Sequence, residues 1–142
     1  MEYDYLKIAG QSAVVTGGGR GIGRATALAL GRFGVKVVVC DVRDDWGEDA
    51  VREIREGGGT AMYCHCDVAD PGQVKALVQA AVGAYGTVDI LVNNAGIGSV
   101  SLPFEEITDE DWDRMLRVDL TAPFYLCREV IPYMKAKQHG KI

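Results

Sequence analysis

The sequence has no run of basic residues, no apolar stretch long enough to cross a membrane and no signal-peptide pattern at its N-terminus. Its net charge is −5 over 142 residues, which argues against binding to nucleic acid or to an anionic membrane surface. A spanning helix needs about 20 apolar residues, and a secretory signal needs a charged and an apolar region. We therefore expect a soluble, cytoplasmic protein whose partners include neither nucleic acid nor a membrane.

The cysteines are poorly spaced for a metal site. The four cysteines are Cys40, Cys64, Cys66 and Cys127. The Cys64-His65-Cys66 segment brings metal-binding residue types together, but its spacing is not that of a zinc site and no second cysteine pair completes one. All four cysteines fall in segments predicted as strands or helices. We expect buried or half-buried free thiols, a reducing compartment and no metal.

Linkers, internal repeats and low-complexity tracts are absent, so residues 1–142 are predicted to form a single domain. Strands predicted at 12–15, 35–40, 61–66 and 89–92 alternate with helices that follow a glycine turn, Asp45, Asp70 and Thr108. The last three residues are candidate helix N-caps. Residues 141–142 are typical of the start of a fifth strand. Strands that alternate with helices predict a parallel sheet with right-handed crossovers.

Glycine is abundant, at 18 of 142 residues, and it gathers in the turn Thr16-Gly17-Gly18-Gly19-Arg20-Gly21-Ile22-Gly23. The turn follows the apolar segment 12–15 and opens an Ala/Leu-rich helix, an arrangement that places a phosphate at a helix N-terminus. Gly17 permits the tight turn. Gly21 and Gly23 lack the Cβ that would block a pyrophosphate or the helix–strand contact. The pattern predicts dinucleotide binding, with a purely structural turn as the alternative.

Asp41 ends the second predicted strand, 18 residues after Gly23, where an acid is expected to accept hydrogen bonds from the adenosine ribose. A carboxylate there repels the extra phosphate of NADP, so the sequence favours NAD. Arg43 lies two residues further on and could hold that phosphate, which keeps NADP open. A solvated acid at the end of a strand is the alternative interpretation of Asp41.

These segments together resemble the classical short-chain dehydrogenases/reductases. The resemblance rests on Thr16-Gly17-x-x-x-Gly21-Ile22-Gly23, on Asp67-Val68 and on Asn93-Asn94-Ala95-Gly96, and it covers essentially the whole chain. It implies an α/β fold with a Rossmann-type doubly wound parallel sheet, truncated after the fourth strand, the following helix and the start of a fifth strand. It also implies the cofactor-binding part of an NAD-dependent oxidoreductase that transfers hydride between nicotinamide and a small-molecule alcohol or carbonyl substrate.

The resemblance assigns roles to individual residues. Asp67 would hydrogen-bond the adenine amino group and Val68 would line the adenine pocket. The residues implied to hold the cofactor in the glycine turn are Gly17, Gly19, Arg20, Gly21, Ile22 and Gly23. Asn93, Ala95 and Gly96 would pass beneath the ribose and nicotinamide, although the Asn-Asn pair could instead tie neighbouring strands together. The loop at 97–104 would border the substrate site.

The family's catalytic serine, tyrosine and lysine lie beyond the fifth strand, where this sequence has ended. We therefore expect the 142-residue chain to be inactive by itself and the natural protein to continue past Ile142. Tyr133 and Lys137 stand four apart, but they precede the fifth strand and are interpreted as surface residues. A non-catalytic nucleotide-binding or oligomerising protein is the alternative function.

Asp119 stands where the family usually has an asparagine that helps to hold a water in a proton relay. Pro123 has no amide hydrogen, so the carbonyl of Asp119 is expected to be free of the helix ladder and available to such a water. The Asp119 carboxylate accepts hydrogen bonds but cannot donate as an amide does. A part in the relay and a simple place in a helix kink both remain open for Asp119.

The predicted end of the chain would expose apolar surface. Without a complete fifth strand, residues 90–92 would form a bare edge, and the last helix would be uncovered around Phe124, Leu126 and Val130. Such surfaces pair with other chains. In the family, a helix like that at 109–137 packs against a partner subunit, so we expect a homo-oligomer formed through this helix or through the bare edge.

Overall fold

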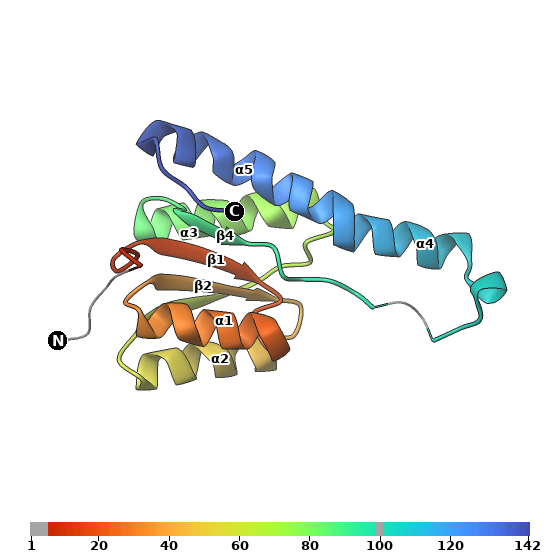
Figure 1. Cartoon of the computed structure of the whole chain (residues 1–142), viewed down its shortest axis with the longest axis horizontal. Helices are drawn as coiled ribbons and strands as arrows, with labels where there is room; N and C mark the ends of the chain where they lie inside the picture. Colours follow the sequence, from red (N-terminus) through yellow and green to blue (C-terminus); the bar gives the residue numbers. More distant parts are fainter. Residues whose placement is uncertain (1–5, 99–100) are drawn as a thin grey trace.

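The computed structural model describes residues 6–98 and 101–142, in which strands and helices alternate (Figure 1). Part of the loop expected to border a substrate, and the N-terminal residues tested for a signal, lie outside the described residues. The elements are β1 (Ser12–Thr16), α1 (Gly21–Arg32), β2 (Lys36–Asp41), α2 (Asp44–Glu56), β3 (Thr60–His65), α3 (Pro71–Tyr85), β4 (Ile90–Val92), the 3₁₀ turn η1 (Phe104–Glu106), α4 (Asp109–Leu116), the π-helical segment η2 (Arg117–Thr121) and α5 (Ala122–Lys137).

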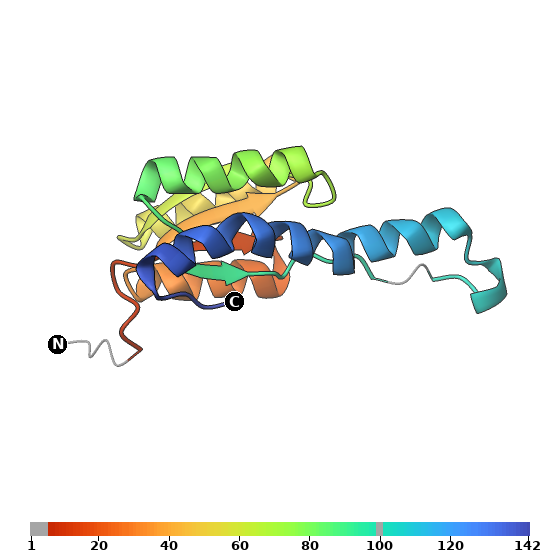
Figure 2. The ribbon, with the colours of Figure 1, turned by 90° about the horizontal axis from the view of Figure 1, so that it is seen from above.

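The four strands form one parallel sheet in the order β3-β2-β1-β4. Helices α1 and α2 cover one face of the sheet, and α3 and α5 cover the other (Figures 1 and 2). Alternate residues of β1 therefore point into two separate cores: Val14 packs with α3 and α5, and Val15 with α1 and α2. Burial on both faces accounts for the nearly continuous β-branched strands. The predicted Rossmann-type doubly wound sheet is confirmed.

Predicted N-caps set the start of two helices, and a third predicted cap needs correction. The Asp70 carboxylate accepts from the amides of Gly72 and Gln73 at 2.8 and 3.2 Å, and Thr108 and Asp111 form a reciprocal capping box. The predicted cap at Asp45 is wrong, because α2 begins one residue earlier, at Asp44, without a side-chain cap. Asp45 instead lies in the first turn, where its negative charge is favourable, and it pairs with Arg43.

The last helix is more covered than the sequence suggested. Leu126 and Val130, expected on an uncovered face, are 1% and 0% exposed because they pack against α3 and the sheet. Phe124 on the same helix is 56% exposed, as expected. The edge of β4 is also partly covered: the Lys141 amide donates to the Asp89 carbonyl, and the Lys141 carbonyl accepts from the Leu91 amide, both at 2.9 Å. These contacts form a parallel bridge that begins a fifth strand beside β4.

Helix α4 extends past the carboxyl ends of the strands (Figure 1). The π-helical segment η2 joins it to α5, so that α4 and α5 form one long rod (Figures 1 and 2). Among residues 6–98 and 101–142, no helix combines the length and the apolar character that crossing a membrane would require.

Candidate functional site

A cavity of about 970 Å³ opens at the carboxyl ends of the strands. Its walls come from the β1–α1 turn, from the chain that follows each of β2, β3 and β4, and from α4 with η2. The carboxyl edge of a doubly wound sheet is where such folds bind ligands, because loops from opposite faces diverge there. The elements that the sequence singled out therefore meet at one place.

The glycine turn forms the floor of the cavity. Gly17 and Gly21 have φ angles of +60° and +56°, in the left-handed region that favours glycine. A Cβ on Gly23 would lie 2.2 Å from the Gly17 carbonyl oxygen, so the first turn of α1 packs directly on the backbone of the turn. Arg20 occupies the N-cap position of α1 and makes no capping bond with its side chain. Gly21 and Ile22 at the start of α1 line the cavity, and no side chain caps this helix as Asp70 caps α3, so its first amides are available to a phosphate.

Asp41 is fixed in the cavity wall by backbone amides. It is 8% exposed, its Oδ2 accepts from the Gly19 amide at 2.9 Å, and its Oδ1 accepts from the Arg43 amide at 3.0 Å. Each carboxylate oxygen keeps acceptor capacity for a further donor. Its burial excludes the alternative of a solvated strand-end acid. Gly19 makes room for this arrangement, since a Cβ there would lie 2.8 Å from Asp41 Oδ2.

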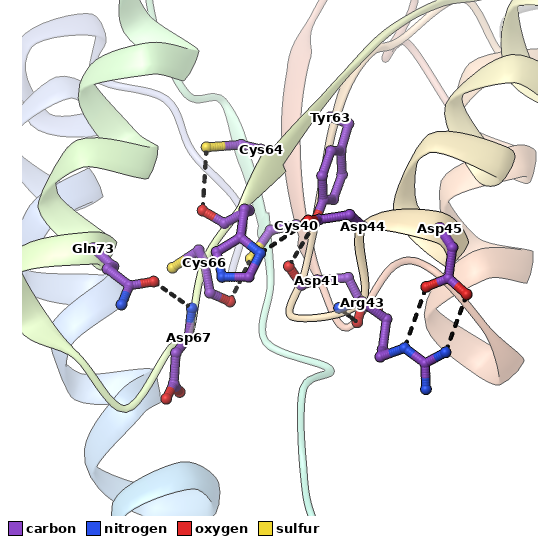
Figure 3. A network of polar contacts seen from close by, with 11 residues as sticks. Cys40, Asp41, Arg43, Asp44, Asp45, Tyr63, Cys64, Cys66, Asp67 and Gln73 are labelled. Atoms are coloured by element: carbon purple, nitrogen blue, oxygen red, sulfur yellow. Dashed lines mark hydrogen bonds and ion pairs between the residues drawn. The ribbon is translucent and has the colours of Figure 1, made fainter.

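Two arginines and a tryptophan line the cavity together with Asp41. The Arg43 guanidinium donates from Nε and Nη2 to the two oxygens of Asp45, at 3.2 and 3.1 Å (Figure 3). This hydrogen-bonded pair lowers the pKa of the Asp45 carboxyl and raises that of Arg43. The Trp46 ring lies under both guanidiniums, with its centroid 4.4 Å from Arg43 Cζ and 4.7 Å from Arg20 Cζ. Arg20, Arg43 and Trp46 all line the cavity.

A polar network behind this wall fixes the start of α2 (Figure 3). The Tyr63 hydroxyl lies 2.6 Å from Asp44 Oδ1 and 2.9 Å from the Asp41 carbonyl oxygen. His65 Nδ1 lies 2.8 Å from the same Asp44 oxygen. Burial and the Asp44 carboxylate raise the pKa of Tyr63, while hydrogen bonds from Tyr63 and His65 lower the pKa of Asp44. The segment from Asp41 to Asp44 is thereby tied to β3.

The chain after β3 supplies the next wall. Asp67 and Val68 both line the cavity, and Asp67 Oδ1 accepts from the Ala69 amide at 3.0 Å. Cys66 lines it too, in a loop rather than in the predicted strand, because β3 ends at His65. The Cys40 thiol donates to the Cys66 carbonyl at 3.8 Å. Interaction between the two cysteine side chains lowers the pKa of Cys66 and, together with burial, raises the pKa of Cys40. All four cysteines are free, as predicted.

The two asparagines after β4 take different positions. Asn94 lines the cavity, and its Nδ2 donates to the carbonyls of Thr16 and Gly17 at 3.0 and 3.2 Å, so it ties β4 to the glycine turn. Asn93 does not line the cavity, and its Nδ2 lies 3.9 Å from the Cys127 sulfur on α5. Ala95 and Gly96 follow as small residues in the wall. Within the described residues, the tie between strands therefore belongs to Asn94.

Asp119, Tyr133 and Lys137 are placed outside the cavity. Asp119 lies in η2, where its Oδ1 accepts from the Ile97 amide at 2.9 Å and so holds the loop after β4. Lys137 lies at the opposite end of the sheet, with its Nζ 2.5 Å from Oδ1 of the buried Asp89. Lys137 is exposed, as the surface interpretation expects, although its amine bonds to Asp89, whereas Tyr133 is partly buried against the core. Burial opposes ionisation of Asp89, but hydrogen bonds from Lys137 and Ser12 outweigh it and lower the pKa of that carboxyl.

Sequence patterns did not indicate one wall of the cavity. Glu110, Asp113, Arg114 and Arg117 line it from α4 and η2, and Trp46 lines it from α2. Helix periodicity does not reveal them, because their position depends on α4 extending past the sheet. The described residues contain no group of three or more His, Cys, Asp or Glu side chains placed to bind a metal.

A family model described as short chain dehydrogenase matches residues 11–142. The chain therefore belongs to the short-chain dehydrogenase/reductase family. Momilactone A synthase of Oryza sativa subsp. japonica is 39% identical over 140 residues, which are 98% of this chain and 50% of that protein.

Solved structures agree with this assignment. 7α-Hydroxysteroid dehydrogenase in complex with NADH and 7-oxo glycochenodeoxycholic acid gives a TM-score of 0.92 at 35% identity, covering 100% of this chain and 56% of that chain. A metagenomic short-chain oxidoreductase in complex with NADP gives 0.89 at 38% identity, covering 94% and 60%. The chain spans about half the length of the curated relatives that it matches. One of these two structures contains NADH and the other contains NADP. A preference of this chain for NAD or NADP therefore depends on its own residues.

Proposed function

We propose that the chain is the cofactor-binding part of an NAD-dependent oxidoreductase that acts on a small-molecule alcohol or carbonyl substrate. The observation that carries the NAD preference is the buried Asp41 carboxylate, fixed by the Gly19 and Arg43 amides at the cavity wall. A carboxylate there accepts from the two ribose hydroxyls of NAD and repels the 2′-phosphate of NADP.

The remaining walls fit the other parts of a dinucleotide. The amides at the start of α1 would hold the pyrophosphate, with Gly17 and Gly21 supplying a surface free of Cβ atoms. Asp67 and Val68 would border the adenine, and Ala95 and Gly96 would leave room for the nicotinamide half. When bound, the nicotinamide ring would donate or accept a hydride, which is chemistry that no side chain of the protein can perform.

We further propose that the 142-residue chain has no dehydrogenase activity by itself. Proton transfer to or from a carbonyl oxygen needs a general acid or base within hydrogen-bond reach. The Tyr133–Lys137 pair cannot provide it, because Lys137 is bound to Asp89 at the amino end of β4 and the cavity lies at the carboxyl ends. Asp119 holds the Ile97 amide, so it is proposed to act on the shape of the loop after β4.

Calorimetric titration with NADH and NADPH tests the cofactor proposal. We expect NADH to bind more tightly than NADPH. Asp41→Asn should reduce the difference in binding free energy between the two cofactors. Loss of hydrogen bonds to a charged acceptor should weaken NADH binding by about 1.5–3 kcal/mol. Glu48→Gln, which removes a carboxylate outside the cavity wall, is the matched control. Equal or tighter binding of NADPH by the unaltered protein would refute the NAD preference.

A further inference from the structure

The ribose side of the cavity carries charges of both signs. Asp41 favours a ribose with free hydroxyls, whereas Arg20 and Arg43, which line the same cavity, are residues able to bind a phosphate. A guanidinium that reached the ribose would offset the repulsion between Asp41 and a 2′-phosphate. The selectivity of this wall therefore depends on where the two guanidiniums are held.

Arg43 is engaged by Asp45. Its Nε and Nη2 both donate to the Asp45 carboxylate, at 3.2 and 3.1 Å, in a two-pronged pair that matches the shape of the guanidinium. Figure 3 shows the guanidinium directed at Asp45 and away from Asp41. A phosphate that approached the ribose would have to compete with this carboxylate for the same N–H groups.

Trp46 engages both arginines. Its ring centroid lies 4.4 Å from Arg43 Cζ and 4.7 Å from Arg20 Cζ, within the range of a cation–π contact. The Cβ of Trp46 lies close to the glycine turn, since a Cβ on Gly19 would be 2.8 Å from it. The guanidiniums of Arg20 and Arg43 thus stack on the same indole ring at the start of α2.

We propose that Asp45 and Trp46 are positioning residues that determine cofactor selectivity: they hold Arg43 and Arg20 against α2, so that Asp41 alone decides in favour of NAD. This inference rests on the proposed function, because it concerns the same cavity. Asp45 and Trp46 act through the arginines and need not touch the ribose.

The test compares binding of ADP-ribose and 2′-phospho-ADP-ribose, which are the adenosine halves of the two cofactors, to the full chain by calorimetry. Asp45→Asn keeps the shape of the side chain and releases Arg43. We expect it to raise the affinity for 2′-phospho-ADP-ribose relative to ADP-ribose by about three- to fivefold, the upper range for an ion pair as exposed as Arg43 and Asp45. Glu48→Gln removes the same charge from the same helix and should leave the ratio within about twofold.

Two further variants separate the contributions. Asp45→Asn combined with Arg43→Gln should return the ratio to that of the unaltered protein, and Trp46→Leu should shift it in the same direction as Asp45→Asn. An Asp45→Asn ratio equal to that of Glu48→Gln, with both ligands bound, would overturn the inference and leave the proposed function intact. Failure of the unaltered protein to bind either ligand would overturn both.

Discussion

The same substitution, glycine to alanine, should have opposite effects in two helices of this protein. Gly23 lies in the first turn of α1, where a Cβ would be 2.2 Å from the Gly17 carbonyl oxygen and 2.4 Å from Asn94 Nδ2. Gly83 lies in α3, and a Cβ there would meet nothing within 4 Å. The comparison separates the cost of crowding from the general benefit of alanine in a helix.

The magnitudes follow from these contacts. Real Cβ atoms essentially never approach closer than 3.0 Å, so Gly23→Ala must move backbone or break the bond from Asn94 to the Gly17 carbonyl. Overpacking of this kind costs about 1–3 kcal/mol, and a lost hydrogen bond about 0.5–1.5 kcal/mol. We expect Gly23→Ala to destabilise the protein by about 2 kcal/mol or more and to abolish NADH binding. Gly83→Ala should stabilise it by about 0.5–1 kcal/mol and leave binding unchanged.

Urea unfolding followed by far-ultraviolet circular dichroism measures both free energies, and calorimetry with NADH measures binding. Gly83→Ala also controls for the loss of backbone freedom in the unfolded chain, which both substitutions share. The reasoning would be refuted if Gly23→Ala unfolded at the same urea concentration as the unaltered protein and bound NADH equally well. A destabilising Gly83→Ala would contradict the open space assigned to that position.

Three further predictions concern other parts of the molecule. Lys137→Met should reduce the free energy of unfolding at pH 7 by about 1.5 kcal/mol, because it removes the hydrogen bond to Asp89. This is the low end of the range for a hydrogen bond to a charged group, since the Lys137 side chain is half-exposed. The pKa of Asp89 is lowered in the folded state, so the stability that the Lys137–Asp89 pair contributes is complete above the unfolded pKa of about 4 and is lost as the pH falls through the folded pKa. Urea unfolding at pH 7 and pH 3 should therefore show a smaller difference in unfolding free energy between Lys137→Met and the unaltered protein at pH 3. A difference that is the same at both pH values would contradict this linkage. The 142-residue chain should not change nicotinamide absorbance with any of a panel of alcohols and ketones, and turnover that disappears in Tyr133→Phe would show that the assignment of the pair is mistaken. Leu120 and Phe124 are 66% and 56% exposed, so we expect the chain to self-associate through them; light scattering at tens of micromolar should show smaller particles for Leu120→Glu/Phe124→Glu, and a monomer that the double substitution leaves unchanged would disprove this surface.

The parts of the fold that depend on local chemistry were predictable from the sequence. The glycine turn, the strand that ends at Asp41 and the caps at Asp70 and Thr108 each follow from a few neighbouring residues. The parallel sheet followed from the alternation of strands and helices. The N-cap prediction at Asp45 was wrong because both Asp44 and Asp45 suit the start of a helix. The choice between them depends on the contact of Asp44 with Tyr63 in β3.

The covered face of the last helix was not predictable in the same way. Periodicity shows that Leu126 and Val130 share a face, but it does not show which neighbour the face meets. The π-helical segment η2 adds to the difficulty, since it shifts the helical phase between α4 and α5. The expected uncovered face is therefore correct for Phe124 and wrong for the two residues that pack against α3.

The residues of the candidate site also fall into those that the sequence could predict and those that it could not. Asp41, Asp67 and the glycine turn could be found because each lies at or just after the end of a strand, where the carboxyl ends of parallel strands converge. Trp46 and the residues of α4 could not, because side-chain stacking and the direction of α4 arise only in the folded molecule. Asn93 and Asn94 are neighbours in sequence with unlike surroundings, and only the structure distinguishes their roles.

A crystal structure of the protein grown with NAD⁺ tests the proposed binding of NAD in the cavity most directly. We predict density for the dinucleotide in the cavity at the carboxyl ends of the strands, with both adenosine ribose hydroxyls within hydrogen-bond distance of the Asp41 carboxylate and the pyrophosphate on the amides that begin α1. The adenine should lie beside Asp67 and Val68. A dinucleotide bound elsewhere, or one in the cavity whose ribose makes no contact with Asp41, would contradict the account.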